Sequence, residues 1–193
     1  MAVVVVVGML ALVGRAMERA RSGAVAGPAV AGAAAPGGGG QPATAPQVGG
    51  RSGAAVGKPS PTIAWPTLAG PTFRLPAGRP AVVYFMAAWC SDCQPEAQAL
   101  GQLQRQLGDR VAILAVDADP SDLESQTRAF FHTAGDPGYA IARDQNGRLA
   151  GAFAVRALDT TVVVNPAGRV VYRDEVATNL PTLKTALAKA EKA

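Results

Sequence analysis

The sequence predicts an α/β fold in residues 63–193, with a central mixed sheet flanked by helices. Continuously apolar runs alternate there with segments whose apolar residues recur at helical spacing. The order is strand, helix, strand, helix, and later two strands and a helix, which is typical of helices packed on both faces of one sheet. The region is also long enough to bury a hydrophobic core of its own.

The first half of this region carries the clearest elements. Residues 81–88, AVVYFMAA, are predicted to form a fully buried strand, and residues 111–116, VAILAV, a second one. Between them, residues 93–107 have apolar positions at helical spacing and are followed by Gly108 as a C-cap. The tetrapeptide SDLE that opens residues 121–135 has the pattern of a capping box, so we expect a helix to begin there.

The second half predicts shorter elements and a hairpin. We expect a short strand at 139–143 and a short helix at 147–154. Residues 160–164 and 169–173 flank the turn sequence Asn-Pro-Ala-Gly and are predicted to pair as an antiparallel hairpin. A final helix begins near Leu180.

Residues 1–21 are predicted to form a hydrophobic membrane anchor or signal-like segment with a basic flank. The apolar run at 2–14 is shorter than the roughly 20 residues that cross a bilayer. Arg15, Arg19 and Arg21 follow it, and by the positive-inside rule they favour a cytoplasmic side for what comes next. The alternative is a buried strand or helix of a soluble fold.

Residues 22–62 consist mostly of Ala, Gly and Pro and show no hydrophobic period. Such a segment buries too little apolar surface to offset the entropy of ordering it. We therefore predict a disordered, flexible linker between the apolar segment and the domain at 63–193.

The formal net charge of +4 lies entirely in the N-terminal third, because basic and acidic residues are equal in number over 63–193. Net charge therefore gives no support for a nucleic-acid partner of the folded domain. Two cysteines in 193 residues exclude a scaffold held together by several disulfides.

The predicted chemistry centres on the sequence Trp89-Cys90-Ser91-Asp92-Cys93, a CxxC pair where a strand gives way to a helix. A thiolate is the nucleophile of disulfide exchange, and the unpaired N–H groups of a helix N-terminus stabilise it. We expect Cys90 to be the nucleophile and Cys93 the resolving thiol. The pair is itself the redox group, so no bound cofactor is expected.

Three other interpretations of the pair are disfavoured. A zinc site requires four ligands, whereas the chain offers one CxxC and one histidine, His132, so we expect no metal. A purely structural disulfide constrains little chain entropy over so short a loop. Two incidental core cysteines would not usually fall at a strand–helix junction.

Residues 85–90, FMAAWC, are similar to the F-W-A-x-W-C pattern of the thioredoxin superfamily, with Met86 in place of Trp. FAVRALDTTVVVNPAGRVVYR resembles the segment Y-G-V-x-G-x-P-T-T-F-V-I-D-x-x-G-x-I-V of its TlpA/ResA-like members. The resemblance covers about residues 63–190. It implies a thioredoxin-like fold, thiol–disulfide oxidoreductase activity, a membrane tether and an extracytoplasmic catalytic domain in the bacterial cell envelope.

The resemblance also singles out Glu96, three residues after Cys93, where that group places a functional Glu. Because Glu96 and Cys93 lie on the same face of the predicted helix, the Glu96 carboxylate would exchange a proton with the resolving thiol. The alternative is a solvent-facing Glu that interacts with the helix dipole.

Tyr84 stands where thioredoxin has a buried Asp. Asp92 is expected to raise the pKa of Cys90, which favours a reductant.

Asp159 aligns with the cis-proline of the family. Because a cis bond before a non-proline residue costs about 3–4 kcal/mol, we predict a trans peptide between Leu158 and Asp159. The alternative role for Asp159 is a loop residue that caps its own backbone. The expected surround of the cysteine pair consists of Trp89, which shields it, and of Ser91, Asp92, Leu158, Asp159 and Thr160.

These features predict a tethered, monomeric thiol–disulfide oxidoreductase that reduces protein disulfides, such as those of an apocytochrome, and exchanges electrons with a membrane or soluble redox partner. One alternative is a Sco-like copper-binding assembly factor using Cys90, Cys93 and Asp159, although Sco proteins use CxxxC and a histidine. A thiol peroxidase is disfavoured, because no Thr-x-x-Cys pattern lies upstream.

Overall fold

The computed structural model describes residues 46–49 and 53–193. The predicted hydrophobic segment, residues 1–21, and most of the predicted linker lie outside the described residues. Within the described part of the chain, no helix combines the length and the apolar character needed to cross a membrane.

The strands form two sheets. Their bounds are β1 Gln47–Gly49, β2 Thr62–Pro66, β3 Thr72–Leu75, β4 Ala81–Met86, β5 Ala112–Asp117, β6 Ala140–Arg143, β7 Thr160–Val164 and β8 Val170–Glu175. The five-stranded sheet has the order β6-β5-β4-β7-β8. The strand β4 is parallel to β5 and antiparallel to β7, and β7 pairs antiparallel with β8. The predicted mixed sheet and its terminal hairpin are therefore confirmed.

The helices are α1 Gln94–Leu107, α2 Glu124–Thr133, α3 Arg148–Ala152 and α4 Leu180–Lys192, with 3₁₀ turns η1 Ser91–Cys93 and η2 Gly108–Arg110. Gly108 caps α1 as predicted, with φ of 55°. The capping box predicted at Ser121 is wrong. The helix α2 starts three residues later, where the Gln126 side chain accepts from the Leu123 N–H (2.6 Å), and Ser121 donates to Asp119 instead.

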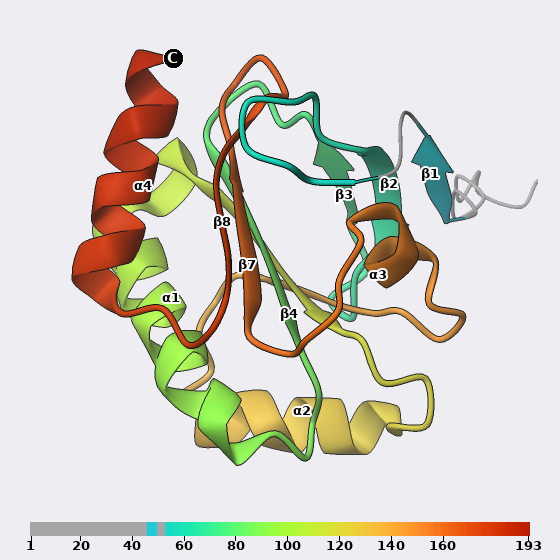
Figure 1. Cartoon of the computed structure of the whole chain (residues 1–193). Helices are drawn as coiled ribbons and strands as arrows, with labels where there is room; N and C mark the ends of the chain where they lie inside the picture. The colour runs from blue at the N-terminus through green and yellow to red at the C-terminus, as the bar shows by residue number, and fades with distance from the viewer. Residues whose placement is uncertain (1–45, 50–52) are drawn as a thin grey trace, which may run out of the picture. The chain divides into compact units, whose positions relative to one another are not determined.

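The strand β4 lies at the centre of the fold and is buried on both faces, with all six residues 0% exposed. Val82, Tyr84 and Met86 pack into the core cluster that α1, α2 and α4 cover. The alternate residues of β4 face a second cluster, formed with β2, β3 and α3 (Figure 1). Burial on both sides explains the continuously apolar run, and the alternation points Tyr84 towards α1.

The folded domain begins earlier in the chain than predicted. Part of the range assigned to the linker is ordered: β1 pairs with β2, and Ala54 is buried. The Gly57 and Ser60 N–H groups donate to Val170 O and Gly168 O at 2.8 Å each. These contacts attach residues 53–60 to the β7–β8 hairpin, so the boundary at residue 63 is corrected towards the N-terminus.

The hairpin of β2 and β3 was not predicted, and its residue Trp65 anchors it to the main sheet. Trp65 is buried in the cluster beneath β4, and its indole N–H donates to Arg143 O at 3.1 Å. The hairpin thus covers the face of the sheet opposite to α1.

The packing on the sheet face covered by β2 and β3 can be tested at Phe153. This residue is fully buried, and its ring centroid lies 5.4 Å from that of Phe85. Phe153→Ala is expected to lower the free energy of unfolding by about 3–5 kcal/mol, measured by urea denaturation. The control Val56→Ala, at a side chain 59% exposed, is expected to change it by less than about 0.5 kcal/mol. A loss below about 1 kcal/mol for Phe153→Ala would contradict the packing.

Candidate active site

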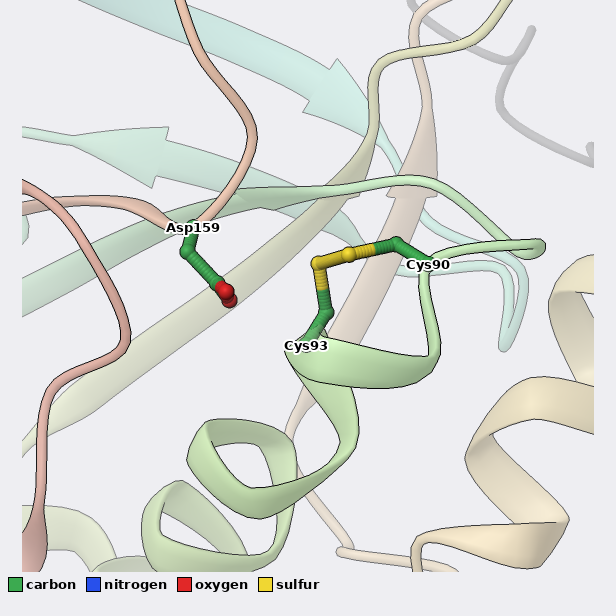
Figure 2. Close-up of side chains that lie close together, drawn as sticks. All are labelled: Cys90, Cys93 and Asp159. Atoms are coloured by element: carbon green, nitrogen blue, oxygen red, sulfur yellow. A yellow bond between two sulfur atoms is a disulfide. The ribbon is translucent and has the colours of Figure 1, made fainter.

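Cys90 and Cys93 form a disulfide at the N-terminus of α1, with an S–S distance of 2.01 Å and a Cα–Cα distance of 5.4 Å (Figure 2). Cys90 lies in the turn after β4 and is partly exposed, whereas Cys93 is fully buried. Cys90 is therefore the more accessible residue of the pair.

Backbone hydrogen bonds set the path of this turn. The Cys90 N–H donates to Ala87 O (3.0 Å) and the Cys93 N–H to Cys90 O (3.2 Å). The Ala88 N–H donates to the Asp122 carboxylate (2.7 Å), which ties the turn to the segment before α2. Proline in the first turn of α1 is compatible with helix initiation, because its missing N–H would have no partner there.

The predicted surround divides into exposed and buried members. Trp89 is 66% exposed, and its indole N–H donates to Asp119 Oδ2 at 2.7 Å, so this ring lies at the surface rather than packed over the disulfide. Ser91 and Asp92 are exposed between the cysteines. These three residues present the accessible side of the site to a substrate.

Leu158 and Thr160 belong to the buried side. Leu158 packs against the core cluster that contains Cys93. Thr160 is fully buried, and its hydroxyl donates to Ala157 O at 2.7 Å. Both residues therefore shape the segment that carries Asp159 to the disulfide.

Glu96 is fully buried, so the solvent-facing alternative is wrong. The Thr161 hydroxyl donates to one carboxylate oxygen (2.5 Å) and the Thr178 N–H to the other (2.7 Å). Burial raises the pKa of Glu96 to about 8. The two hydrogen bonds oppose this increase in pKa, and the nearby Asp174 and Asp159 add to it.

Asp159 precedes β7 in a left-handed conformation, with φ of 58°, which Asp tolerates better than most residues. The cis peptide bond of the described residues is Leu75–Pro76, so the predicted trans bond at Leu158–Asp159 is confirmed. The side chain does not cap its own backbone. It accepts a hydrogen bond from the Tyr84 hydroxyl at 2.7 Å and is 7% exposed, which corrects the alternative of a self-capping loop residue.

The Asp159 carboxylate faces the disulfide (Figure 2). One of its oxygens and the sulfur atoms of Cys90 and Cys93 all lie within 4.8 Å of one another. Burial raises the pKa of Asp159, and the charges of Asp92 and Asp174 raise it further, while the hydrogen bond from Tyr84 lowers it.

Tyr84 is a site residue whose contacts the sequence did not reveal. Its hydroxyl is fully buried and lies 2.9 Å from Cys93 O as well as 2.7 Å from Asp159. Burial, and then the hydrogen bond to Asp159, raise the pKa of Tyr84. The sequence predicted a buried strand here, but no local pattern indicated the direction of the Tyr84 side chain or its partners.

Cys90, Cys93 and Asp159 are also the residues of the copper alternative. In the disulfide the two sulfur atoms are bonded to each other and supply no thiolate, the form in which cysteine binds metals. The histidine of Sco-like sites has no counterpart here, since His132 lies exposed on α2 with its Nδ1 3.0 Å from Asp136. The residues present therefore fit a redox disulfide better than a metal centre.

A CxxC disulfide at the start of a helix, next to the central strand of a mixed sheet, defines a thioredoxin-like domain of the thiol–disulfide oxidoreductase class. The chain belongs to the AhpC/TSA family, whose sequence pattern matches residues 56–173.

The chain is similar to several known proteins. A thiol:disulfide interchange protein DsbE homolog of Paracoccus denitrificans is 32% identical over 149 residues, which cover 70% of this chain and 79% of the relative. The mercury resistance operon ORF3 of Streptomyces lividans is 29% identical over 105 residues, or 53% of this chain and 56% of that protein. A solved thiol:disulfide interchange protein of Chlorobium tepidum shares the fold, with a TM-score of 0.59, 20% identity and coverage of 70% of this chain and 97% of its own.

The buried Glu96 predicts a dependence of stability on pH. Between the ordinary pKa of 4.5 and the raised pKa of about 8, the native protein holds a proton on Glu96 that the unfolded chain has lost. The stability that this proton contributes is complete below pH 4.5 and is lost as the pH rises through 8.

We therefore expect the unfolding free energy of the oxidised protein to fall, relative to that of Glu96→Gln, by up to about 1.4 kcal/mol per pH unit between pH 5 and 8. Urea denaturation of both proteins at four pH values measures this slope. Parallel pH dependences would contradict the assignment.

Proposed function

We propose that this chain reduces protein disulfides through its CxxC dithiol, with Cys90 as nucleophile and Cys93 as resolving thiol. The observation that carries the proposal is the difference in exposure within the pair. Cys90 is partly exposed in a turn at the start of α1, where a substrate sulfur can reach it, and Cys93 is buried behind it. The N–H groups at the helix start favour a thiolate on Cys90.

The proposed cycle starts from the dithiol. The Cys90 thiolate attacks a substrate disulfide, which forms a mixed disulfide and releases one substrate thiolate. Cys93 then loses its proton, and its sulfur attacks Cys90 Sγ and releases the second substrate thiolate. Two electrons have passed to the substrate, and the Cys90–Cys93 disulfide seen in the structure is the product. A membrane or soluble dithiol partner restores the dithiol, and no bound cofactor takes part.

The charges around the pair support the direction of electron flow. Asp92 lies between the cysteines, and a carboxyl oxygen of Asp159 lies within 4.8 Å of both sulfur atoms. Negative neighbours disfavour thiolates and thus favour the disulfide over the reduced form. A CxxC site whose reduced form is not stabilised donates electrons. Strongly oxidising CxxC proteins, by contrast, have a stabilised reduced form.

We also propose that residues 1–21 tether the catalytic domain to the bacterial cell envelope, with the domain on the extracytoplasmic side. The apolar run at 2–14 and the linker composition support a tether. The resemblance to TlpA/ResA-like proteins favours the extracytoplasmic side, against the three arginines that follow the apolar run. The substrates are then envelope proteins that carry disulfides, such as apocytochromes. The domain acts as a monomer, and its equal numbers of acidic and basic residues support no nucleic-acid partner.

Cysteine variants test this cycle in the dithiothreitol-driven reduction of insulin. Cys90→Ser is expected to reduce the catalysed rate to that of dithiothreitol alone, because the remaining thiol, Cys93, is buried and cannot reach the substrate disulfide. Cys93→Ser is expected to retain the attack and to accumulate a mixed disulfide between Cys90 and insulin, detected by mass spectrometry.

His132→Ala serves as the control, since His132 lies exposed on α2 and outside the site. It is expected to retain the wild-type rate. Catalysis by Cys90→Ser, or a mixed disulfide formed through Cys93 in the wild-type protein, would refute the assigned roles.

A further inference from the structure

The Tyr84 hydroxyl has one proton but lies within hydrogen-bond distance of two oxygens, Cys93 O at 2.9 Å and Asp159 Oδ1 at 2.7 Å. If Asp159 is ionised, both oxygens are acceptors and compete for that proton. If Asp159 is protonated, its hydroxyl donates to Tyr84, and Tyr84 donates to Cys93 O. The hydrogen bonds of the Tyr84 hydroxyl therefore change with the protonation state of Asp159.

The groups that face Asp159 leave it without a compensating cation. Tyr84 faces it from β4, Asp92 from η1 and Asp174 from β8, and Asp159 in turn acts on Glu96 of α1. The cysteine sulfur atoms complete its surroundings. In the described part of the chain, no Lys, Arg or His contributes to the environment of this carboxyl group. Such a carboxyl group changes its protonation state easily when the charge beside it changes.

We propose that Asp159 is the acid–base group that takes the proton from the Cys93 thiol and returns it to the departing substrate thiolate, with Tyr84 as its positioning residue. This inference rests on the proposed exchange cycle. The ionised Asp159 of the dithiol state accepts the Cys93 proton, the Cys93 sulfur attacks Cys90 Sγ, and the bond from Cys90 to the substrate breaks. The proton then passes from Asp159 to the leaving sulfur, so that charge and electrons balance.

Distance and accessibility favour Asp159 over Glu96 for this role. The Asp159 carboxylate lies within 4.8 Å of both sulfurs, a separation that one bridging water spans. Both oxygens of Glu96 already accept hydrogen bonds, from Thr161 and Thr178, and Glu96 is not part of that close group. Asp159 raises the pKa of Glu96 through its charge, and Asp159 itself faces the reacting sulfur atoms.

Single-turnover kinetics of the full chain separate the two steps of the cycle. The reduced protein is mixed with oxidised glutathione between pH 5 and 9, quenched with acid, and analysed by mass spectrometry for the mixed disulfide on Cys90. In Asp159→Asn, which keeps the size of the side chain, the mixed disulfide is expected to form at least as fast as in the wild type. Its resolution by Cys93 is expected to slow by about 10²-fold or more.

Tyr84→Phe provides a second readout that a structural role would not affect. The Tyr84 hydroxyl stabilises the ionised carboxylate of Asp159, so its removal is expected to move the pH midpoint of the resolution step upwards. Asp136→Asn is the matched control, because Asp136 is another aspartate at positive φ, 47°, but lies exposed beside His132. Its rates are expected to match the wild type.

Resolution at the wild-type rate and pH midpoint in Asp159→Asn or in Tyr84→Phe would overturn the role of Asp159, and the exchange cycle would stand. Failure of Cys93→Ser to form any mixed disulfide with glutathione would instead refute the proposed function itself. The two failures are thus distinguishable in one experiment.

Discussion

The crowding of carboxyl groups around one disulfide is the constraint on which the chemistry of this site depends. Asp159 is buried within 4.8 Å of both sulfur atoms, Glu96 is buried three residues after Cys93, and the charges that act on their pKa values come from other carboxylates. A thiolate formed at this site is repelled by the neighbouring carboxylates. Its formation must therefore be coupled to the uptake of a proton by one of these carboxyl groups. The same crowding favours the disulfide over the dithiol, which is the property of a reductant.

The fold creates this crowding through β4 and β7. The strand β4 is buried on both faces and delivers Cys90 to the start of α1, while its inward residue Tyr84 reaches both Cys93 O and Asp159. The adjacent strand β7 supplies Asp159 just before its first residue and Thr161 two residues later, on the same face. One pair of antiparallel strands thus places Asp159 beside the sulfur atoms and provides Glu96 with a hydrogen-bond donor, Thr161.

The sequence was sufficient wherever the information was local. The apolar run of β4, the CxxC pair before α1 and the turn between β7 and β8 each predicted their structure correctly, because burial and turn chemistry act over a few residues. The sequence did not predict contacts whose two residues lie far apart in the chain. The burial of Glu96 depends on Thr161 and Thr178, far away in the chain, and helical position alone did not distinguish a buried from an exposed carboxylate. The ordering of residues 53–60 likewise depends on the β7–β8 hairpin rather than on their own composition.

The reduction potential of the Cys90–Cys93 pair tests the central claim most directly. The full chain is equilibrated with dithiothreitol or glutathione redox buffers, its free thiols are alkylated, and the oxidised fraction is measured by mass spectrometry. The acidic surround predicts one two-electron transition near the potential of thioredoxin, about −270 mV. A potential near about −120 mV, as in strongly oxidising proteins whose reduced form is stabilised, would contradict the claim that electrons leave this site for protein disulfides.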